Sequence, residues 1–212
     1  PSKVNPSFLT ERLESVAGKA AVGQEAAQRN QDITNALAVK ELGLPKGTAL
    51  TEASLKAVRK EAGKTYEEVS KLEPPASMDW FPRFHDKNLL EQLKTARADA
   101  NLAYKSNTVT PHPDMLAKAK ALTATADSLD ADLESIAKAN GREDLVKELA
   151  KARTMFAKSY DIERALNLGD SNVSAPILGR QLDKAGTAGK SGALSTIGKM
   201  AEAFPQVMRE GA

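Results

Sequence analysis

The sequence predicts an all-α fold, an elongated bundle of about six or seven helices without a significant sheet. Apolar residues recur every three or four positions through most of the chain, which is the period of an amphipathic helix. Stretches that contain proline or glycine interrupt this period at intervals and so separate the helices. Aromatic residues make up only 4% of the 212 residues, so alanine and leucine have to fill most of the core. Small side chains favour closely packed helices over a sheet sandwich.

The N-terminal third predicts one long helix. Gly18 and Gly23 each cost about 1 kcal/mol in a helix interior, so we expect a break near one of them. The run from Gly43 to Gly47, which includes Pro45, is a strong stop signal. The apolar positions of this helix are Leu9, Leu13, Val16, Ala20, Ala27, Ile33 and Leu37.

The second helix has the clearest amphipathic pattern in the chain, and Thr51 is its predicted N-cap. We expect Lys56, Arg59 and Lys60 to lie outside its apolar stripe, and Pro74-Pro75 to end the segment. That stripe consists of Leu55, Val58, Ala62, Tyr66, Val69 and Leu72.

Asp86 is the predicted cap of a third helix from about Lys87 to Lys105. We expect a loop from Asn107 to Pro113, because prolines interrupt backbone hydrogen bonding there. A long fourth helix is predicted from Asp114 to the C-terminal signal Asn140-Gly141.

A fifth helix is predicted to stop near Asn167-Leu168-Gly169. Ser174 is then expected to cap a short helix. The last helix follows a glycine-rich linker from Ala185 to Gly192, and it ends at Pro205.

The pattern divides the chain into three segments. Residues 1–73 form an N-terminal helical segment, residues 74–169 form central helical hairpins, and residues 170–212 carry short helices on the glycine-rich linker. One continuous domain is an alternative, and so are two halves that are split near Pro74-Pro75.

Composition excludes several functional classes. The net charge of +2, from 30 basic and 28 acidic residues, gives no general attraction to nucleic acid or to an anionic membrane. The absence of cysteine removes disulfides and thiolate metal sites. No stretch approaches the roughly 20 apolar residues that span a bilayer, so we expect no stable membrane insertion.

The sharpest catalytic-looking motif is Gly189-Lys190-Ser191, which ends a phosphate-binding loop in nucleotide-binding proteins. Lys184 occupies the place of the first glycine of that loop, and helical sequence precedes it instead of a buried strand. The stretch is therefore interpreted as a linker between helices.

We expect no metal site, cofactor or catalytic residue, and so no enzyme. His85 and His112 have no histidine partner at a spacing of four, and they are interpreted as exposed loop residues. No Gly-x-Ser-x-Gly motif is present to activate a serine. A helical wall-degrading hydrolase is the enzymatic alternative, but no acidic residue in the sequence stands out for that role. DNA contact is not favoured, because glutamates interleave with the basic residues of the second helix.

Two segments are candidate partner-binding sites. Large aromatics in a proline-bearing connection can anchor a partner, or else they plug the end of the chain's own bundle. The apolar stripe of the last helix can dock into a groove on a neighbour, or else it belongs to the intrachain core. The candidate residues are Trp80, Phe81 and Phe84 in the connection, and Leu194, Ile197, Met200 and Phe204 in the last helix.

The two ends of the chain resemble poorly characterised proteins of tailed bacteriophages and prophages. The resemblance covers about half of the chain. It is carried by Val4–Leu9, Asn30–Asn35, Ala157–Asn167, Asn172–Ala175, Leu178-Gly179, Leu182, Ile197, Ala201 and Ala203–Pro205. It implies a component of a phage particle, made in the host cytoplasm, and it supplies no enzymatic residues.

These observations together predict a non-enzymatic structural protein of the phage neck or tail. We expect it to bind other virion proteins, such as portal, neck or tail components, through its helices and to form a homo-oligomer in the particle. The alternative is an internal virion protein that is ejected with the genome and contacts DNA or the membrane during delivery.

Overall fold

The predicted all-α class is confirmed. The computed structural model describes residues 6–78, 88–167, 169–184 and 195–199. It is 79% helical, and the sheet that it contains is a small antiparallel pair, β1 (Leu166–Asn167) and β2 (Asn172–Val173). The helices are α1 (Pro6–Glu41), α2 (Glu52–Val69), the short 3₁₀ helix η1 (Ala76–Met78), α3 (Leu89–Val109), α4 (Pro113–Ala139), α5 (Glu143–Ala165) and α6 (Ala175–Lys184). Residues 195–199 are also helical.

Helix α1 is continuous for 36 residues, so the expected break near Gly18 or Gly23 does not occur. The cost of one glycine is small beside the backbone hydrogen bonds that a long helix keeps by running through it. The helix ends where the sequence predicts. Gly43 and Gly47 have φ angles of 66° and 84°, a left-handed conformation that glycine adopts without strain.

The predicted N-cap of α2 is confirmed as a reciprocal capping box. The backbone N–H of Ser54 donates to Thr51 Oγ1 at 3.2 Å, and the backbone N–H of Thr51 donates to Ser54 Oγ at 2.9 Å. The predicted apolar stripe faces inward, and its buried members are Leu55, Val58, Tyr66 and Val69.

The expected loop from Asn107 to Pro113 is shorter than predicted. Helix α3 continues to Val109, and Pro113 is already the first residue of α4, a position where a proline costs nothing because its missing N–H would be unpaired anyway. His112 caps α4, since its Nδ1 accepts a hydrogen bond from the backbone N–H of Asp114 at 3.3 Å. The predicted cap of α3, Asp86, lies outside the described residues.

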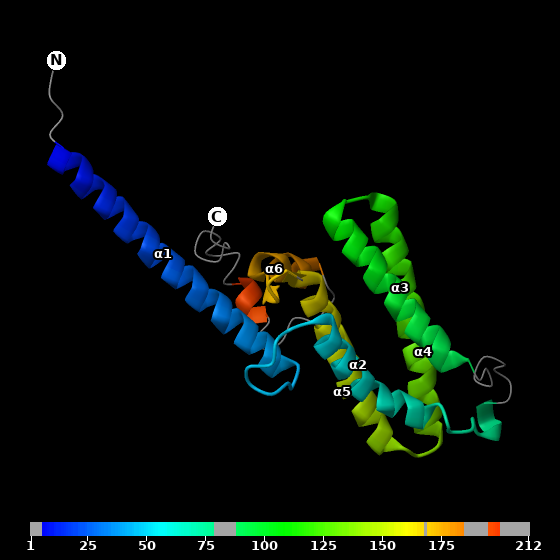
Figure 1. Ribbon diagram of the computed structural model, residues 1–212. Coiled ribbons are helices and arrows are strands. Elements are labelled where there is room, and N and C mark those ends of the chain that lie inside the picture. The colour runs from blue at the N-terminus through cyan, green and yellow to red at the C-terminus, as the bar shows by residue number, and fades with distance from the viewer. Residues whose placement is uncertain (1–5, 79–87, 168, 185–194, 200–212) are drawn as a thin grey trace. The chain divides into compact units, whose positions relative to one another are not determined.

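The chain forms two compact units that differ from the three predicted segments. Unit 1 combines residues 1–48 with residues 167–212, and unit 2 consists of residues 49–166. The boundary falls at the Gly43–Gly47 turn and not near Pro74-Pro75, because α2 packs against α5 and so belongs with the central helices. Within unit 2, α2 lies beside α5 and α3 lies beside α4 (Figure 1).

The apolar core of unit 2 lies at one end of the four helices. It is built where α2 and α4 end and where α3 and α5 begin, and we call this the apolar end. Its buried members are Tyr66, Val69, Leu89, Leu93, Ala96, Ala126, Leu133, Ile136, Ala137, Leu145, Leu149 and Ala152. Leucine and alanine dominate the set, as the composition predicts.

Unit 1 contains a very close helix crossing. A Cβ atom on Gly179 of α6 would lie 2.9 Å from the carbonyl oxygen of Gly198, closer than real Cβ atoms approach. Two glycines therefore allow the backbone of α6 to touch the helical turn at residues 195–199. Leu178 and Ile197 beside them are buried.

Among the described helices, none combines the length and the apolar character needed to cross a membrane.

Candidate functional site

An amide clamp in unit 1 joins α1 to β2. Asn35 Oδ1 accepts a hydrogen bond from the backbone N–H of Val173 at 2.9 Å, and Gln31 Nε2 donates to the Val173 carbonyl at 3.1 Å. Asn35 Nδ2 also donates to Asn172 Oδ1 at 2.8 Å. We define Gln31, Asn35, Asn172 and Val173 as the amide clamp.

The clamp binds the backbone groups of Val173 in the way that a neighbouring strand would bind them. Gln31 and Asn35 are four residues apart, so they lie one above the other on the same helical face, and Gln31 Nε2 donates to Asn35 Oδ1 at 3.1 Å. Together their side chains satisfy both the N–H and the carbonyl of Val173, the two groups that a neighbouring strand would bind. An edge strand with unsatisfied groups invites pairing with another chain, and the clamp protects β2 from it.

A polar seam crosses the interior of unit 2, and its best-buried part is a triad. Tyr66 Oη donates to Asp130 Oδ1 at 2.7 Å, and Arg97 Nη2 donates to Tyr66 Oη at 2.7 Å and also to Asp130 Oδ2. The Arg97 guanidinium lies over the rings of Tyr66 and Phe156, with centroid distances of 4.6 and 4.5 Å. Three helices, α2, α3 and α4, are thereby joined at one point.

The surroundings of Tyr66 in this triad favour the protonated form of its phenol. The pKa of Tyr66 is raised from 10.0 to about 12, mainly by burial and also by the neighbouring Asp130 carboxylate, while the Arg97 charge acts in the opposite direction. The phenol therefore stays protonated at neutral pH and can only donate to Asp130. It has the wrong pKa for a general base.

Arg153 extends the triad to α5. Its Nη2 donates to Glu134 Oε2 at 3.1 Å, and its Nε lies 3.6 Å from Asp130 Oδ2. Arg153 thus pairs α5 with two carboxylates of α4, one buried and one partly exposed.

Glu163 is the second centre of the seam. Its carboxylate accepts hydrogen bonds from Arg59 Nη1 at 2.7 Å, from Asn101 Nδ2 at 3.2 Å and from Lys105 Nζ at 3.4 Å. One side chain of α5 therefore binds α2 and α3 at once. Lys105 Nζ also lies 3.8 Å from Glu52 at the start of α2.

Cation–π contacts complete this part of the seam. The Arg59 guanidinium lies over the Tyr160 ring at 4.8 Å, and that of Arg164 lies over the Tyr104 ring at 5.0 Å. Arg164 also pairs with Asp161. Burial raises the pKa of the Asp161 carboxyl, and the Arg164 charge partly offsets this effect.

We define the polar seam by the residues of these contacts: Glu52, Arg59, Tyr66, Arg97, Asn101, Tyr104, Lys105, Asp130, Glu134, Arg153, Phe156, Tyr160, Asp161, Glu163 and Arg164. In the described part of the chain, the buried side-chain polar atoms without a hydrogen-bond partner are all in this set. They are Asn101 Oδ1, Arg153 Nε and Arg164 Nε.

A hollow of about 450 Å³ lies along α3 and α4. Its lining is mainly apolar and hydroxyl-bearing, with Asp132 as its one carboxylate. Nowhere in residues 6–78, 88–167, 169–184 and 195–199 do three or more His, Asp or Glu side chains gather in a way that could hold a metal ion.

The structure describes few of the predicted partner-binding residues. Ile197 is 3% exposed and lies within unit 1. The candidates in the connection between α2 and α3, the other candidates in the last helix, the glycine-rich linker and His85 lie outside the described residues. Those that cannot be placed are Trp80, Phe81, Phe84, Leu194, Met200 and Phe204.

One outward-facing prediction is wrong. Arg59 was expected outside the α2 stripe with Lys56 and Lys60, yet its side chain is only 14% exposed and binds Glu163. A long arginine stem can cover apolar surface while its guanidinium turns back towards an acid. His112, by contrast, is exposed as expected, but it serves as a helix cap.

The sequence pattern predicts neither the clamp nor the seam. A signal for the seam exists, because Arg97 is four residues after buried Leu93, and Asp130 is four residues after buried Ala126. Charged side chains at inward positions of a helical stripe indicate an internal ion pair. No comparable signal marks the clamp.

Comparison with protein-family models, curated proteins and solved structures finds no match to this chain. The likeness to phage proteins therefore stays a prediction.

Proposed function

We propose that the chain is a non-enzymatic structural protein of the neck or tail of a tailed-bacteriophage particle, and that it binds other virion proteins through its helices. The observation that carries the proposal is the amide clamp. It joins Asn30–Asn35 of α1 to Asn172–Ala175, two of the segments on which the resemblance to phage proteins rests. Segments that are about 140 residues apart in sequence thus form one feature of the fold.

The long helix α1 supports binding through a helix face. At 1.5 Å per residue its 36 residues span about 54 Å. The buried side chains described in α1 all lie between Thr34 and Val39, whereas residues 24–33 are exposed or half-buried. Ile33 is 51% exposed. An exposed apolar side chain on a helix can contribute to binding a partner in a groove.

The seam supports the same class of function. Asp130, Asp161 and Glu163 are each held by an arginine, and Tyr66 by an arginine and a carboxylate. The pairs of Asp130 and Glu163 join different helices and so define how these helices pack in the closed unit, whereas Asp161 pairs within α5.

Incorporation into particles tests the proposal. An epitope-tagged full chain is supplied to cells that produce tailed-phage particles, and the particles are purified by density banding and probed for the tag. A variant that disrupts the clamp, Gln31→Ala with Asn35→Ala, is compared with Gln28→Ala and Asp32→Ala. The second pair removes an exposed hydrogen bond with the same spacing on the same helix.

We expect the tagged chain and the control variant in the particle band, and less of the clamp variant. Retention of the chain after the genome is released supports a neck or tail position. Loss of the chain together with the genome would replace the proposal with the ejected-protein alternative. A chain that never bands with particles contradicts a virion role altogether.

A further inference from the structure

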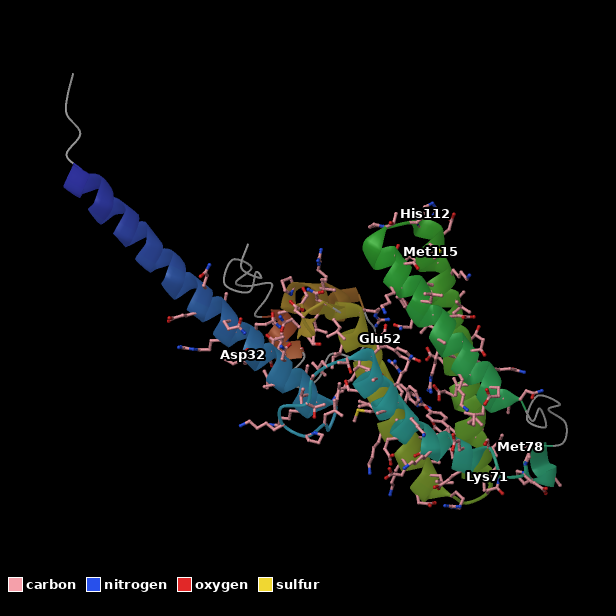
Figure 2. The ribbon with its side chains drawn as sticks, in the orientation of Figure 1. Asp32, Glu52, Lys71, Met78, His112 and Met115 are labelled. Carbon is pink, nitrogen blue, oxygen red and sulfur yellow. The ribbon has the colours of Figure 1, made fainter. Side chains whose placement is uncertain are left out.

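The four helices of unit 2 are assembled as two pairs. α2 packs along α5, and α3 packs along α4, whereas contacts between the pairs are few (Figure 1). Figure 2 shows side chains filling the space between the two pairs, with Glu52 labelled at one end of α2 and Lys71 just beyond the other.

The chemistry between the pairs changes along their length. At the apolar end, near Lys71, the pairs share buried leucine and alanine side chains. Towards Glu52, the contacts between the pairs include hydrogen bonds, ion pairs and cation–π contacts. Examples are Asn101 and Lys105 with Glu163, Arg164 over Tyr104, and Lys105 with Glu52.

Contacts of this kind are readily exchanged for water. The cost of removing buried charges from water offsets much of the attraction within an ion pair. The burial of apolar side chains, in contrast, lowers the free energy of the folded state directly. The three buried polar atoms without a partner, Asn101 Oδ1, Arg153 Nε and Arg164 Nε, also gain hydrogen bonds when water reaches them. The half of the seam nearest Glu52 is thus the place where water can enter unit 2 at the least cost in free energy.

We propose that unit 2 is a clasp. The α3/α4 pair parts from the α2/α5 pair along the half of the polar seam nearest Glu52, and it turns about the apolar end, which includes Tyr66, while each pair stays intact. Glu163 is the latch, because its single carboxylate holds Arg59 of α2 and both Asn101 and Lys105 of α3. Opening turns the Tyr104 and Arg164 side chains, which contact each other across the two pairs, towards solvent.

Distance measurements between spin labels test the clasp. The chain has no cysteine, so labels attach only to introduced ones. One label pair, Lys56→Cys with Lys118→Cys, spans the two helix pairs. A second, Asp99→Cys with Lys118→Cys, stays within the α3/α4 pair. All three positions are exposed.

Each label pair is measured in the full chain and with Glu163→Gln, which weakens the latch. Glu148→Gln is the matched control, because it makes the same change on α5 at an exposed acid that pairs only locally with Lys151. With Glu163→Gln we expect a second, longer-distance population between residues 56 and 118. We expect no change between residues 99 and 118, and no change in either pair with Glu148→Gln.

An unchanged distance between residues 56 and 118 in the latch variant overturns the clasp. Equal broadening of both label pairs overturns it too, because that result reports loss of the fold. If Glu163→Gln loses its helical circular dichroism, Lys105→Met replaces it with the same expectations, since the Lys105 side chain is already 35% exposed.

Discussion

Asn35 accepts a hydrogen bond from the backbone N–H of Val173 across 138 residues of sequence. This contact and its partner from Gln31 supply what a third strand would supply to β2. The end of α1 is therefore fixed to the second part of unit 1 by directional bonds as well as by apolar packing.

Removal of the clamp should expose the Val173 amide. We expect Gln31→Ala with Asn35→Ala to lower the stability of unit 1 by about 1–3 kcal/mol, because the buried backbone groups of Val173 lose their partners. Hydrogen exchange of the Val173 amide measures the effect. The Gln28→Ala and Asp32→Ala variant should leave that amide protected, and equal loss in both variants would contradict the assigned role.

The phenol of Tyr66 should stabilise unit 2 through its hydroxyl. We expect Tyr66→Phe to cost about 1–3 kcal/mol, because Asp130 loses a buried donor while the ring stays in place. Urea denaturation measures the difference. Tyr160→Phe is the comparison, since the ring contact of Tyr160 with Arg59 remains when its hydroxyl is removed. A larger loss with Tyr160→Phe than with Tyr66→Phe would contradict this account.

The pKa of Tyr66 makes a prediction at alkaline pH. Burial raises that pKa from 10.0 to about 12, so between these values the folded chain binds the proton that the unfolded chain has released. The contribution of this proton to the free energy of unfolding is complete below pH 10, and it is lost as the pH rises towards 12. Ultraviolet titration should show the last of the three tyrosines ionising near pH 12, and this step should vanish in Tyr66→Phe. A late step that persists in the variant belongs to another tyrosine.

The helix crossing in unit 1 should not tolerate a methyl group. We expect Gly179→Ala to destabilise the chain by about 1–3 kcal/mol, since its Cβ would meet the Gly198 carbonyl at 2.9 Å. Gly63→Ala in α2 meets no atom within 4 Å and should stabilise the chain by about 1 kcal/mol. Thermal unfolding of both variants gives the comparison. Equal melting temperatures would show that the crossing can relax.

The solution mass of the full chain tests self-association. We expect a ring-sized oligomer by light scattering whose mass is the same at low and high salt, because burial of apolar helix faces is little screened by ions. A monomer under both conditions would mean that assembly requires a different protein.

The local features of the fold follow from the sequence. The cap at Thr51, the turn at Gly43–Gly47 and the C-terminal signal at Asn140-Gly141 depend on residues close in the chain, and the structure confirms all three. Helix α3 ends later than the sequence predicts, because Pro111 and Pro113 limit only their immediate neighbours. A helix can continue to Val109 before them.

Features that join distant residues could not be derived in this way. Arg59 has the spacing of a solvent-facing residue, and only the fold brings Glu163 within 2.7 Å of it. Likewise, amides at a spacing of four, such as Gln31 and Asn35, occur on many exposed helices. Their role depends on a two-residue strand that is too short to leave a pattern of its own.

The discontinuous composition of unit 1 has a consequence during synthesis. α1 leaves the ribosome first, but Val173 is made 138 residues after Asn35. At elongation rates of about 5–20 residues per second this delay lasts about 7–28 s, which is longer than the helices of unit 2 need to fold. During that interval Gln31 and Asn35 of α1 cannot yet bind Val173. A chaperone or a neighbouring nascent chain can therefore bind this face of α1 before the clamp forms.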